Sequence, residues 1–161
     1  MTSPGLYVHI PLCLAKCGYC NFYSIAAPEL APRFAPAIIG EMAFYKNAFR
    51  NFDTVYFGGG TPSVLPASSI DEILNAAHKM FDIDRHAEIT LEANPGDLSL
   101  EYLRSLYSMG INRLNIGVQS FDDAILKFLG RRHTSKEALS SFDKARRAGF
   151  DNIGIDLIYA V

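Results

Sequence analysis

Short apolar runs alternate with segments of helical periodicity along this chain of 161 residues. The apolar runs predict strands at residues 6–10, 54–57, 88–92, 113–118 and 153–158. Between them, apolar residues recur at helical spacing, as at Phe34, Ile38 and Met42. This pattern predicts helices at residues 32–50, 69–80, 99–110, 122–129 and 135–148. The regular alternation predicts an α/β fold with a parallel sheet and right-handed crossovers.

Capping signals mark several of the predicted helix ends. Ser69 with Glu72, and Thr134 with Glu137, have the spacing of a capping box, in which each side chain binds the other's backbone N–H. Gly149 follows the last predicted helix, where a terminating glycine is common. These signals predict that two helices begin at Ser69 and Thr134 and that the last helix ends at Gly149.

The predicted strands carry apolar residues on both faces, which is typical of buried parallel strands. The length of the chain suggests one domain. The last strand is followed only by residues 159–161, with no segment to cover it. An apolar edge strand is prone to pair with other chains. We therefore expect a truncated domain, or one that needs a partner, and we expect the isolated chain to self-associate.

Charge and hydropathy exclude several classes of function. The 15 basic and 17 acidic side chains nearly cancel and no basic block stands out, so no nucleic-acid partner is expected. No apolar run reaches the ~20 residues that span a bilayer. The start of the chain also lacks a signal-type segment. These observations predict a cytoplasmic protein without a transmembrane segment.

The three cysteines, Cys13, Cys17 and Cys20, all lie within one short segment. An odd, clustered set is a poor disulfide framework and a candidate metal site. Three thiolates on one loop can hold an iron–sulfur cube and leave one iron open to a ligand. The alternatives are a zinc site completed by His9 and three free thiols.

Several polar or glycine-rich features follow the predicted strands. The second strand ends in Gly-Gly-Gly-Thr-Pro at residues 58–62, the third at Glu92 and the fourth at Gln119, while Asp156 lies in the fifth. Ligands of parallel α/β folds bind at the carboxyl ends of the strands, so these features and the cysteine loop are expected at one mouth. Arg131 either adds a cation there for a carboxylate or is a solvated arginine at a helix end.

These motifs resemble the radical S-adenosylmethionine (SAM) superfamily, and within it the oxygen-independent coproporphyrinogen oxidase-like group. The resemblance is carried by the cysteine loop, the glycine turn and Glu-Ala-Asn-Pro, together with Tyr-Val-His-Ile-Pro, Asn-Ile-Gly-Val-Gln-Ser-Phe, Leu-Gly-Arg-x-His and Asp-Leu-Ile-Tyr. It implies a partial (βα)6 radical SAM barrel of parallel strands, truncated after the fifth strand. Residues 1–161 would then form an incomplete radical SAM core domain.

The resemblance also implies the roles of individual residues. Cys13, Cys17 and Cys20 would ligate three irons of a [4Fe–4S] cluster, and SAM would bind the fourth iron. Further SAM contacts would come from Tyr7, Tyr19, Gly59, Gly60, Thr61, Glu92, Gln119, Arg131 and Asp156, with Arg131 nearest the SAM carboxylate. The implied chemistry is one-electron cleavage of SAM to methionine and a 5′-deoxyadenosyl radical, which requires an electron donor.

Phe22 separates two branches of the group. Oxygen-independent coproporphyrinogen III oxidases have a fourth cysteine two residues after the third, where this chain has Phe22. The branch of HemW-type haem chaperones, which bind haem and pass it to an acceptor protein, has phenylalanine there. The resemblance therefore favours a role in haem transfer and porphyrin metabolism. The alternatives are the oxidase, which is an enzyme, and a non-functional fragment or zinc-binding module.

Overall fold

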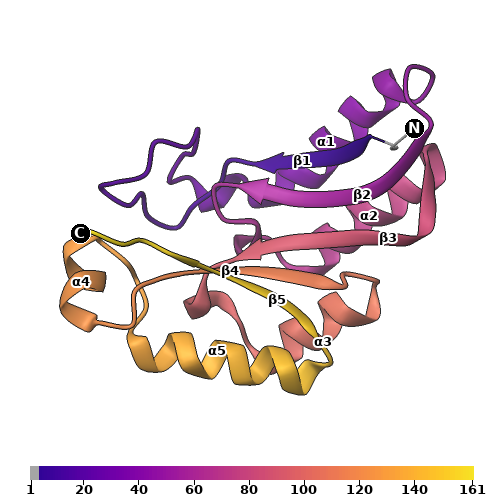
Figure 1. Ribbon diagram of the computed structural model, residues 1–161. Helices are drawn as coiled ribbons and strands as arrows, with labels where there is room; N and C mark the ends of the chain where they lie inside the picture. Colours follow the sequence, from indigo (N-terminus) through magenta and orange to yellow (C-terminus); the bar gives the residue numbers. More distant parts are fainter. Residues whose placement is uncertain (1–3) are drawn as a thin grey trace.

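The computed structural model describes residues 4–161. The start of the chain, where no signal-type segment is expected, lies partly outside this range, at residues 1–3. Five parallel strands form one sheet in chain order (Figure 1). The strands are β1 (Gly5–Ile10), β2 (Asn51–Gly59), β3 (Asp82–Ala93), β4 (Arg113–Gln119) and β5 (Asn152–Leu157). The predicted parallel α/β sheet is confirmed.

Helices connect the successive strands and cover one face of the curved sheet (Figure 1). They are α1 (Ala31–Tyr45), α2 (Ala67–Met80), α3 (Leu100–Ser108), α4 (Asp123–Phe128) and α5 (Ser135–Ala148), with short 3-10 helices η1 (Pro28–Leu30), η2 (Pro62–Val64) and η3 (Pro95–Asp97). Helix α1 packs beside α2, and α3 beside α5. Among residues 4–161, none of these helices is long and apolar enough to cross a membrane.

The two faces of the sheet differ in burial, which corrects the expectation of strands buried on both sides. Along β4, Leu114, Ile116 and Val118 are buried, whereas Asn115 and Gly117 between them are only half-buried. The buried set packs on the helices. The other face, here called the pocket face, carries Tyr56, Glu92, Asn115 and Asp156, which are half-buried or exposed.

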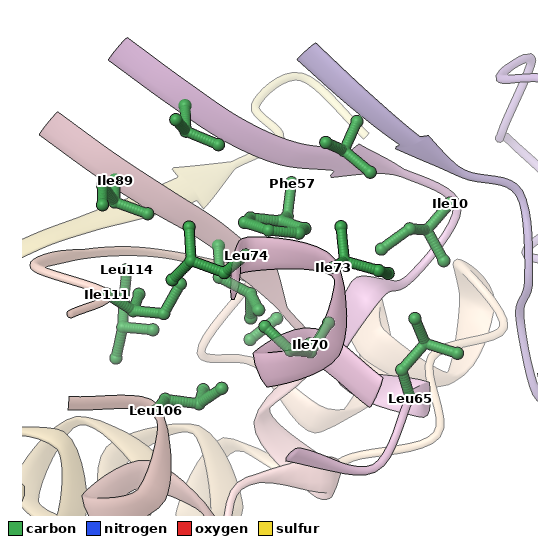
Figure 2. Close-up of a cluster of buried hydrophobic side chains, with 14 of the residues drawn as sticks. Ile10, Phe57, Leu65, Ile70, Ile73, Leu74, Ile89, Leu106, Ile111 and Leu114 are labelled. Carbon is green, nitrogen blue, oxygen red and sulfur yellow. The ribbon is translucent and has the colours of Figure 1, made fainter. Parts of the chain in front are cut away.

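The core between sheet and helices holds the strand ends in place. Ile70, Ile73 and Leu74 of α2 follow one another at helical spacing and are buried at 2% exposure or less. They pack with Ile10 and Phe57, which lie at the carboxyl ends of β1 and β2 (Figure 2). Burying each such side chain contributes about 1.5–3 kcal/mol. The core therefore anchors the points from which the cysteine loop and the glycine turn depart.

Two of the three predicted helix ends are as expected. Thr134 and Glu137 form a complete capping box at the start of α5, and Gly149 ends that helix. The capping box predicted at Ser69 is wrong. Helix α2 begins at Ala67, because Pro66 O already accepts hydrogen bonds from Ser69 N at 3.0 Å and from Ile70 N at 3.4 Å. Ser69 is therefore buried inside the first turn.

The helix predicted at residues 32–50 is also too long, because α1 ends at Tyr45. Ala48 N and Phe49 N both donate to Tyr45 O, at 2.9 and 3.1 Å, and this turn leads the chain into β2. Strand β2 begins at Asn51, which pairs with Asp82 at the start of β3. Both strands are longer than predicted, since their pairing extends beyond the apolar runs.

Strand β5 lies at the edge of the sheet, as predicted. Ile155 and Leu157 are 39% and 58% exposed. They pair in register with Ile116 and Gln119 of β4. Strand β5 is the last element of the described residues, and β4 is its only neighbour in the sheet. The result is an unpaired edge with exposed apolar side chains.

Candidate functional site

The carboxyl ends of the strands surround a pocket of about 500 Å³. This volume lies in the range of ligand sites, roughly 300–1,000 Å³. The segment between β1 and α1, which carries the cysteines, extends beyond the strand ends on this side of the molecule (Figure 1). The predicted site residues that line the pocket are Cys13, Cys17, Tyr19, Cys20, Gly59, Gly60, Thr61, Glu92, Gln119, Arg131 and Asp156.

Tyr7 is the one predicted site residue that does not line this pocket. It lies on β1, 53% exposed, with its ring stacked on Tyr56 at a centroid distance of 5.9 Å. Its hydroxyl lies 3.3 Å from His9 Nδ1. Tyr7 therefore lies outside the pocket lining, in contact with Tyr56, which does line the pocket.

Both ring nitrogens of His9 have partners away from the thiols. Nε2 lies 3.2 Å from Tyr23 O, and since a carbonyl only accepts, Nε2 carries the proton. Nδ1 then accepts from the Tyr7 hydroxyl. His9 is absent from the pocket lining, and no other histidine lines it within residues 4–161. The zinc alternative, which uses His9 as the fourth ligand, gains no support from this arrangement.

The cysteine loop is closed at its base by two backbone hydrogen bonds. Cys13 N donates to Ile25 O at 2.9 Å, and Ile25 N donates to Pro11 O at 2.8 Å. Cys13 is buried near this base, whereas Cys17 and Cys20 lie half-buried further along the loop, all as free thiols. Across the described part of the chain, no three metal-ligating side chains lie close enough to bind an ion as they stand. The loop presents three thiols around one pocket.

This set of side chains fits an iron–sulfur cluster better than a closed zinc shell. Structural zinc sites take four cysteine or histidine ligands, and within the described range the pocket lining holds three cysteines and no histidine. A cube with three thiolate ligands keeps one iron for another ligand. Thr61 Oγ1 lies 3.3 Å from Cys13 Sγ, and Arg131 Nη1 donates to Cys17 Sγ at 3.5 Å. Hydrogen bonds to sulfur are among the interactions that tune such clusters.

The glycine turn allows the cysteine loop to pack against the end of β2. A Cβ on Gly60 would lie 2.9 Å from Leu12 O and 3.0 Å from Cys13 Sγ, so a larger residue would push the cysteine away. Gly59 has φ 116°, a conformation that L side chains rarely adopt. Gly60 N and Thr61 N donate to the carbonyls of Ile10 and Leu12 at 2.8 and 2.9 Å. The turn is therefore fixed to the first residues of the loop.

Glu92 is held from two sides by β2. Tyr56 Oη donates to Glu92 Oε1 at 2.7 Å, and Gly59 N donates to Glu92 Oε2 at 3.1 Å. Burial, followed by the hydrogen bond to the carboxylate, raises the pKa of Tyr56, so its hydroxyl stays protonated and remains a donor. Tyr56 also lines the pocket and is not among the site residues predicted from the sequence. Its only signal is a tyrosine two residues before the glycine turn.

Asp156 has an equivalent partner on the neighbouring strand. Asn115 Nδ2 donates to Asp156 Oδ2 at 2.8 Å, and both residues line the pocket. Asn115 is likewise not among the predicted site residues. Its position between Leu114 and Ile116, which are buried, is the only sign that it faces the other side of the sheet.

Arg131 reaches into the pocket and is not a solvated helix-end residue. Its Nη2 donates to Gly117 O at 2.6 Å, and its Nη1 lies 3.4 Å from Tyr19 Oη. The Nε of Arg131 is buried and has no hydrogen-bond partner among the described residues. Leaving a buried donor unpaired costs about 1–3 kcal/mol, which an acceptor bound at this atom would offset. The adjacent Arg132 instead pairs with Asp97 at 3.0 Å.

Gln119 ends β4 in a strained turn. Its φ is 70°, which is uncommon for a residue other than glycine, and Ser120 N donates to Val118 O at 2.9 Å across it. This is the hydrogen bond of a γ-turn, whose positive-φ form is rare. Gln119 O accepts from Ile158 N at 2.9 Å, which ties the turn to the residue after β5. Strain of this kind often occurs at ligand sites.

Comparison with known proteins agrees with this arrangement. The family described as the Radical SAM superfamily matches residues 7–161, and the chain therefore belongs to that superfamily. Similar curated proteins include the haem chaperone HemW of Lactococcus lactis, 40% identical over 156 residues. HemW of Escherichia coli is 34% identical over 162 residues. The matches cover 96% and 98% of this chain, but 41% and 43% of the relatives.

A solved structure confirms the fold as part of a radical SAM barrel. The coproporphyrinogen III oxidase HemN of Escherichia coli, described as a radical SAM enzyme, superposes with a TM-score of 0.89 at 30% sequence identity. The match covers 98% of this chain and 38% of HemN. The chain thus spans about two fifths of the length of these proteins, with coverage of 38–43%.

Proposed function

We propose that residues 1–161 form the radical SAM core of a HemW-like protein, which holds a [4Fe–4S] cluster on Cys13, Cys17 and Cys20 and binds SAM beside it. The observation that carries the proposal is the pocket itself. It brings three thiols, two carboxylates and an incompletely paired guanidinium together at the carboxyl ends of five parallel strands. Superfamily membership supports the same pair of cofactors.

The residues around the pocket match the charges of SAM. SAM carries an anionic carboxylate, a cationic amino group, a sulfonium and ribose hydroxyls. Arg131, with its unpaired Nε, would bind the carboxylate. The carboxylates of Glu92 and Asp156 would accept hydrogen bonds from the amino group and the hydroxyls. Gly59, Gly60, Thr61, Tyr19 and Gln119 would complete the contacts, and Tyr7 would act through Tyr56.

The cofactors would supply one-electron cleavage of SAM, with electrons from a separate donor. The task of this chain is then to hold and enclose them. Cys13 is buried at the base of the loop, and Tyr19 and Phe22 stand beside the pocket. Aromatic cover of this kind limits the access of water to a cluster. Arg131 would place a fixed positive charge between the thiolates and the SAM carboxylate.

For the biological role we propose haem transfer to an acceptor protein, in the cytoplasm. Two observations support it: the HemW relatives and the phenylalanine at position 22. Phe22 lines the pocket and is 68% exposed. A phenyl ring can neither donate a thiol hydrogen nor ligate a metal. The runner-up function is coproporphyrinogen III oxidation, which the structural similarity to HemN favours.

The proposal is tested by anaerobic reconstitution with iron and sulfide. We expect about four irons per chain, the content of one [4Fe–4S] cube. Replacing Cys13, Cys17 or Cys20 with alanine should abolish the cluster. As a matched control, Ser24→Ala changes a small side chain of the same loop without removing a thiol. Stoichiometric zinc without iron in freshly purified protein would contradict the proposal.

The biological role needs a second assay. The reconstituted protein, supplied with SAM and a reductant, should leave coproporphyrinogen III unchanged. Haem binding, measured by a shift of the haem absorbance band during titration, is expected of a longer version that spans the length of the HemW relatives. Formation of protoporphyrinogen IX would instead support the oxidase and overturn the haem-transfer role.

A further inference from the structure

Asp156 stands on the edge strand, where little else fixes its side chain. Strand β5 has a neighbour on one side only, and Asp156 is exposed. Within residues 4–161 its carboxylate makes one hydrogen bond, from Asn115 Nδ2 to Oδ2 at 2.8 Å. The other oxygen, Oδ1, has no hydrogen-bond partner among the described residues, and both Asp156 and Asn115 line the pocket. The orientation of this carboxylate therefore depends on a residue of the neighbouring strand.

The side chain of Asn115, on β4, passes over Gly154 of β5 to reach Asp156. The two strands place Asn115 beside Gly154 in register, with Gly117 beside Asp156. A Cβ on Gly154 would overlap Asn115 Oδ1 and would lie 3.5 Å from Asn115 Cγ. The space left by the missing side chain is thus filled by the Asn115 amide. Asn115, Gly154 and Asp156 form one unit, called the β4–β5 clamp below.

The charged residues nearby do not replace this contact. Arg113 Nη2 would lie 3.3 Å from a Cβ on Gly154. The Nη1 of Arg113, however, donates to Thr90 Oγ1 on β3, the strand on the opposite side of β4 from β5. Arg131 donates to Gly117 O, which leaves its cation beside β4. Glu92 pairs in register with Asn115 and is occupied by donors from β2. Asn115 is therefore the donor that fixes Asp156.

We propose that Asn115 is a positioning residue, which holds one oxygen of Asp156 so that the other is aimed at the hydroxyl or amino groups of bound SAM. The inference rests on the proposed function, since it assumes that SAM occupies this pocket. It also explains Gly154, because any larger residue there would displace the Asn115 amide.

A double-mutant cycle tests the clamp. The affinity for SAM is measured by titrating the change that SAM causes in the electron paramagnetic resonance spectrum of the reduced cluster. We expect Asn115→Ala to weaken SAM binding roughly fivefold, as for one lost hydrogen bond. Asn115→Ala should cause little further loss in an Asp156→Ala background, because the residue acts through that carboxylate. Iron content and the spectrum without SAM should not change.

Gly154→Ala provides an independent arm. It should weaken SAM binding in the wild-type background and have no further effect once Asn115 is alanine, because the displaced amide is then absent. A merely structural role of Asn115 would weaken binding in both Asp156 backgrounds.

The outcomes separate the clamp from the proposed function. An unchanged affinity in Asn115→Ala, or losses that simply add in the double mutant, would refute the clamp while SAM binding stands. If the cluster spectrum of the wild-type protein does not change when SAM is added, both the proposed function and the clamp are refuted. If Gly154→Ala fails to fold, the cycle between Asn115 and Asp156 still decides.

Discussion

The Tyr56 hydroxyl donates a 2.7 Å hydrogen bond to Glu92 Oε1, joining β2 to β3 across the pocket face. Because Gly59 N binds the other carboxylate oxygen at 3.1 Å, Glu92 is fixed at both oxygens before any ligand arrives. Asn115 makes the corresponding contact to Asp156 from β4 to β5. Both candidate carboxylates are thus oriented by a polar side chain of the preceding strand.

The contact between Tyr56 and Glu92 predicts a defined loss on mutation. Tyr56→Phe removes one hydrogen bond to a charged group, which is worth about 1.5 kcal/mol, and should weaken SAM binding roughly tenfold. The affinity is measured by SAM titration of the reduced, reconstituted protein. Tyr102→Phe is a matched control, since its hydroxyl donates to Leu65 O at 3.0 Å. Tyr102 does not line the pocket, so this control should leave SAM affinity unchanged. Equal losses in both variants would contradict the prediction.

The sequence is sufficient to predict most residues that line the candidate site, but not the side chains that orient them. Cys13, Glu92 and Asp156 follow or end strands, and the strands of a parallel sheet direct their carboxyl ends to one side. Tyr56 and Asn115 look like ordinary strand residues. Their partners are set by the register between strands, which short-range patterns do not specify.

Local geometry explains the remaining differences. The φ of 70° at Gln119 follows from a γ-turn that no residue type at that position indicates. Helix α2 starts at Ala67 because the Pro66 carbonyl supplies its first acceptor, so Ser69 lies inside the first turn and does not cap the helix. Strands β2 and β3 continue beyond their apolar runs because they pair with each other.

The strain at Gln119 predicts an unusual pair of stabilities. Gln119→Gly and Gln119→Ala both remove the side-chain amide and should weaken SAM binding similarly. Glycine relieves the positive φ and alanine does not, so the glycine variant should have the larger free energy of unfolding, by about 1 kcal/mol. Urea denaturation without SAM measures the difference. A more stable alanine variant would show that the turn is not strained.

His133 predicts a dependence of stability on pH. The side chain is 3% exposed, with Nε2 lying 3.0 Å from Val118 O and Nδ1 unpaired among the described residues. Burial, and then the charge of Arg131, lowers the pKa of His133 below its ordinary value of 6.5. The hydrogen bond to Val118 O and then the charge of Glu137 oppose this lowering of the pKa, and Arg132 adds to it. Below that ordinary value the unfolded chain binds the proton more readily than the folded chain does.

The free energy of unfolding should therefore fall as the pH drops below about 6.5 and be fully retained above it. His133→Gln keeps an amide donor for Val118 O and removes the titrating group. Urea denaturation at a neutral and a mildly acidic pH should show a smaller loss for this variant than for the wild type. An identical loss in the two proteins would place the proton uptake elsewhere.

The edge at β5 predicts association of the 161-residue chain. Ile155 and Leu157 are exposed beside unpaired backbone groups, an arrangement that favours pairing with a second chain. Leu157→Lys should shift the size-exclusion profile toward the monomer. Phe44→Lys is the control, because Phe44 is 85% exposed on α1, far from that edge in the sheet order. A stable wild-type monomer would refute the prediction.

The most direct test of the account is the electron paramagnetic resonance spectrum of the reduced cluster, recorded with and without saturating SAM. Three thiols for a four-iron cluster leave one iron for SAM, so the spectrum should change when SAM is added. Glu92→Ala and Arg131→Ala should each weaken that change, since a lost contact to a charged group costs about 1.5–3 kcal/mol. Protein that contains about four irons per chain, as one [4Fe–4S] cube requires, yet gives the same spectrum with and without SAM would contradict the account.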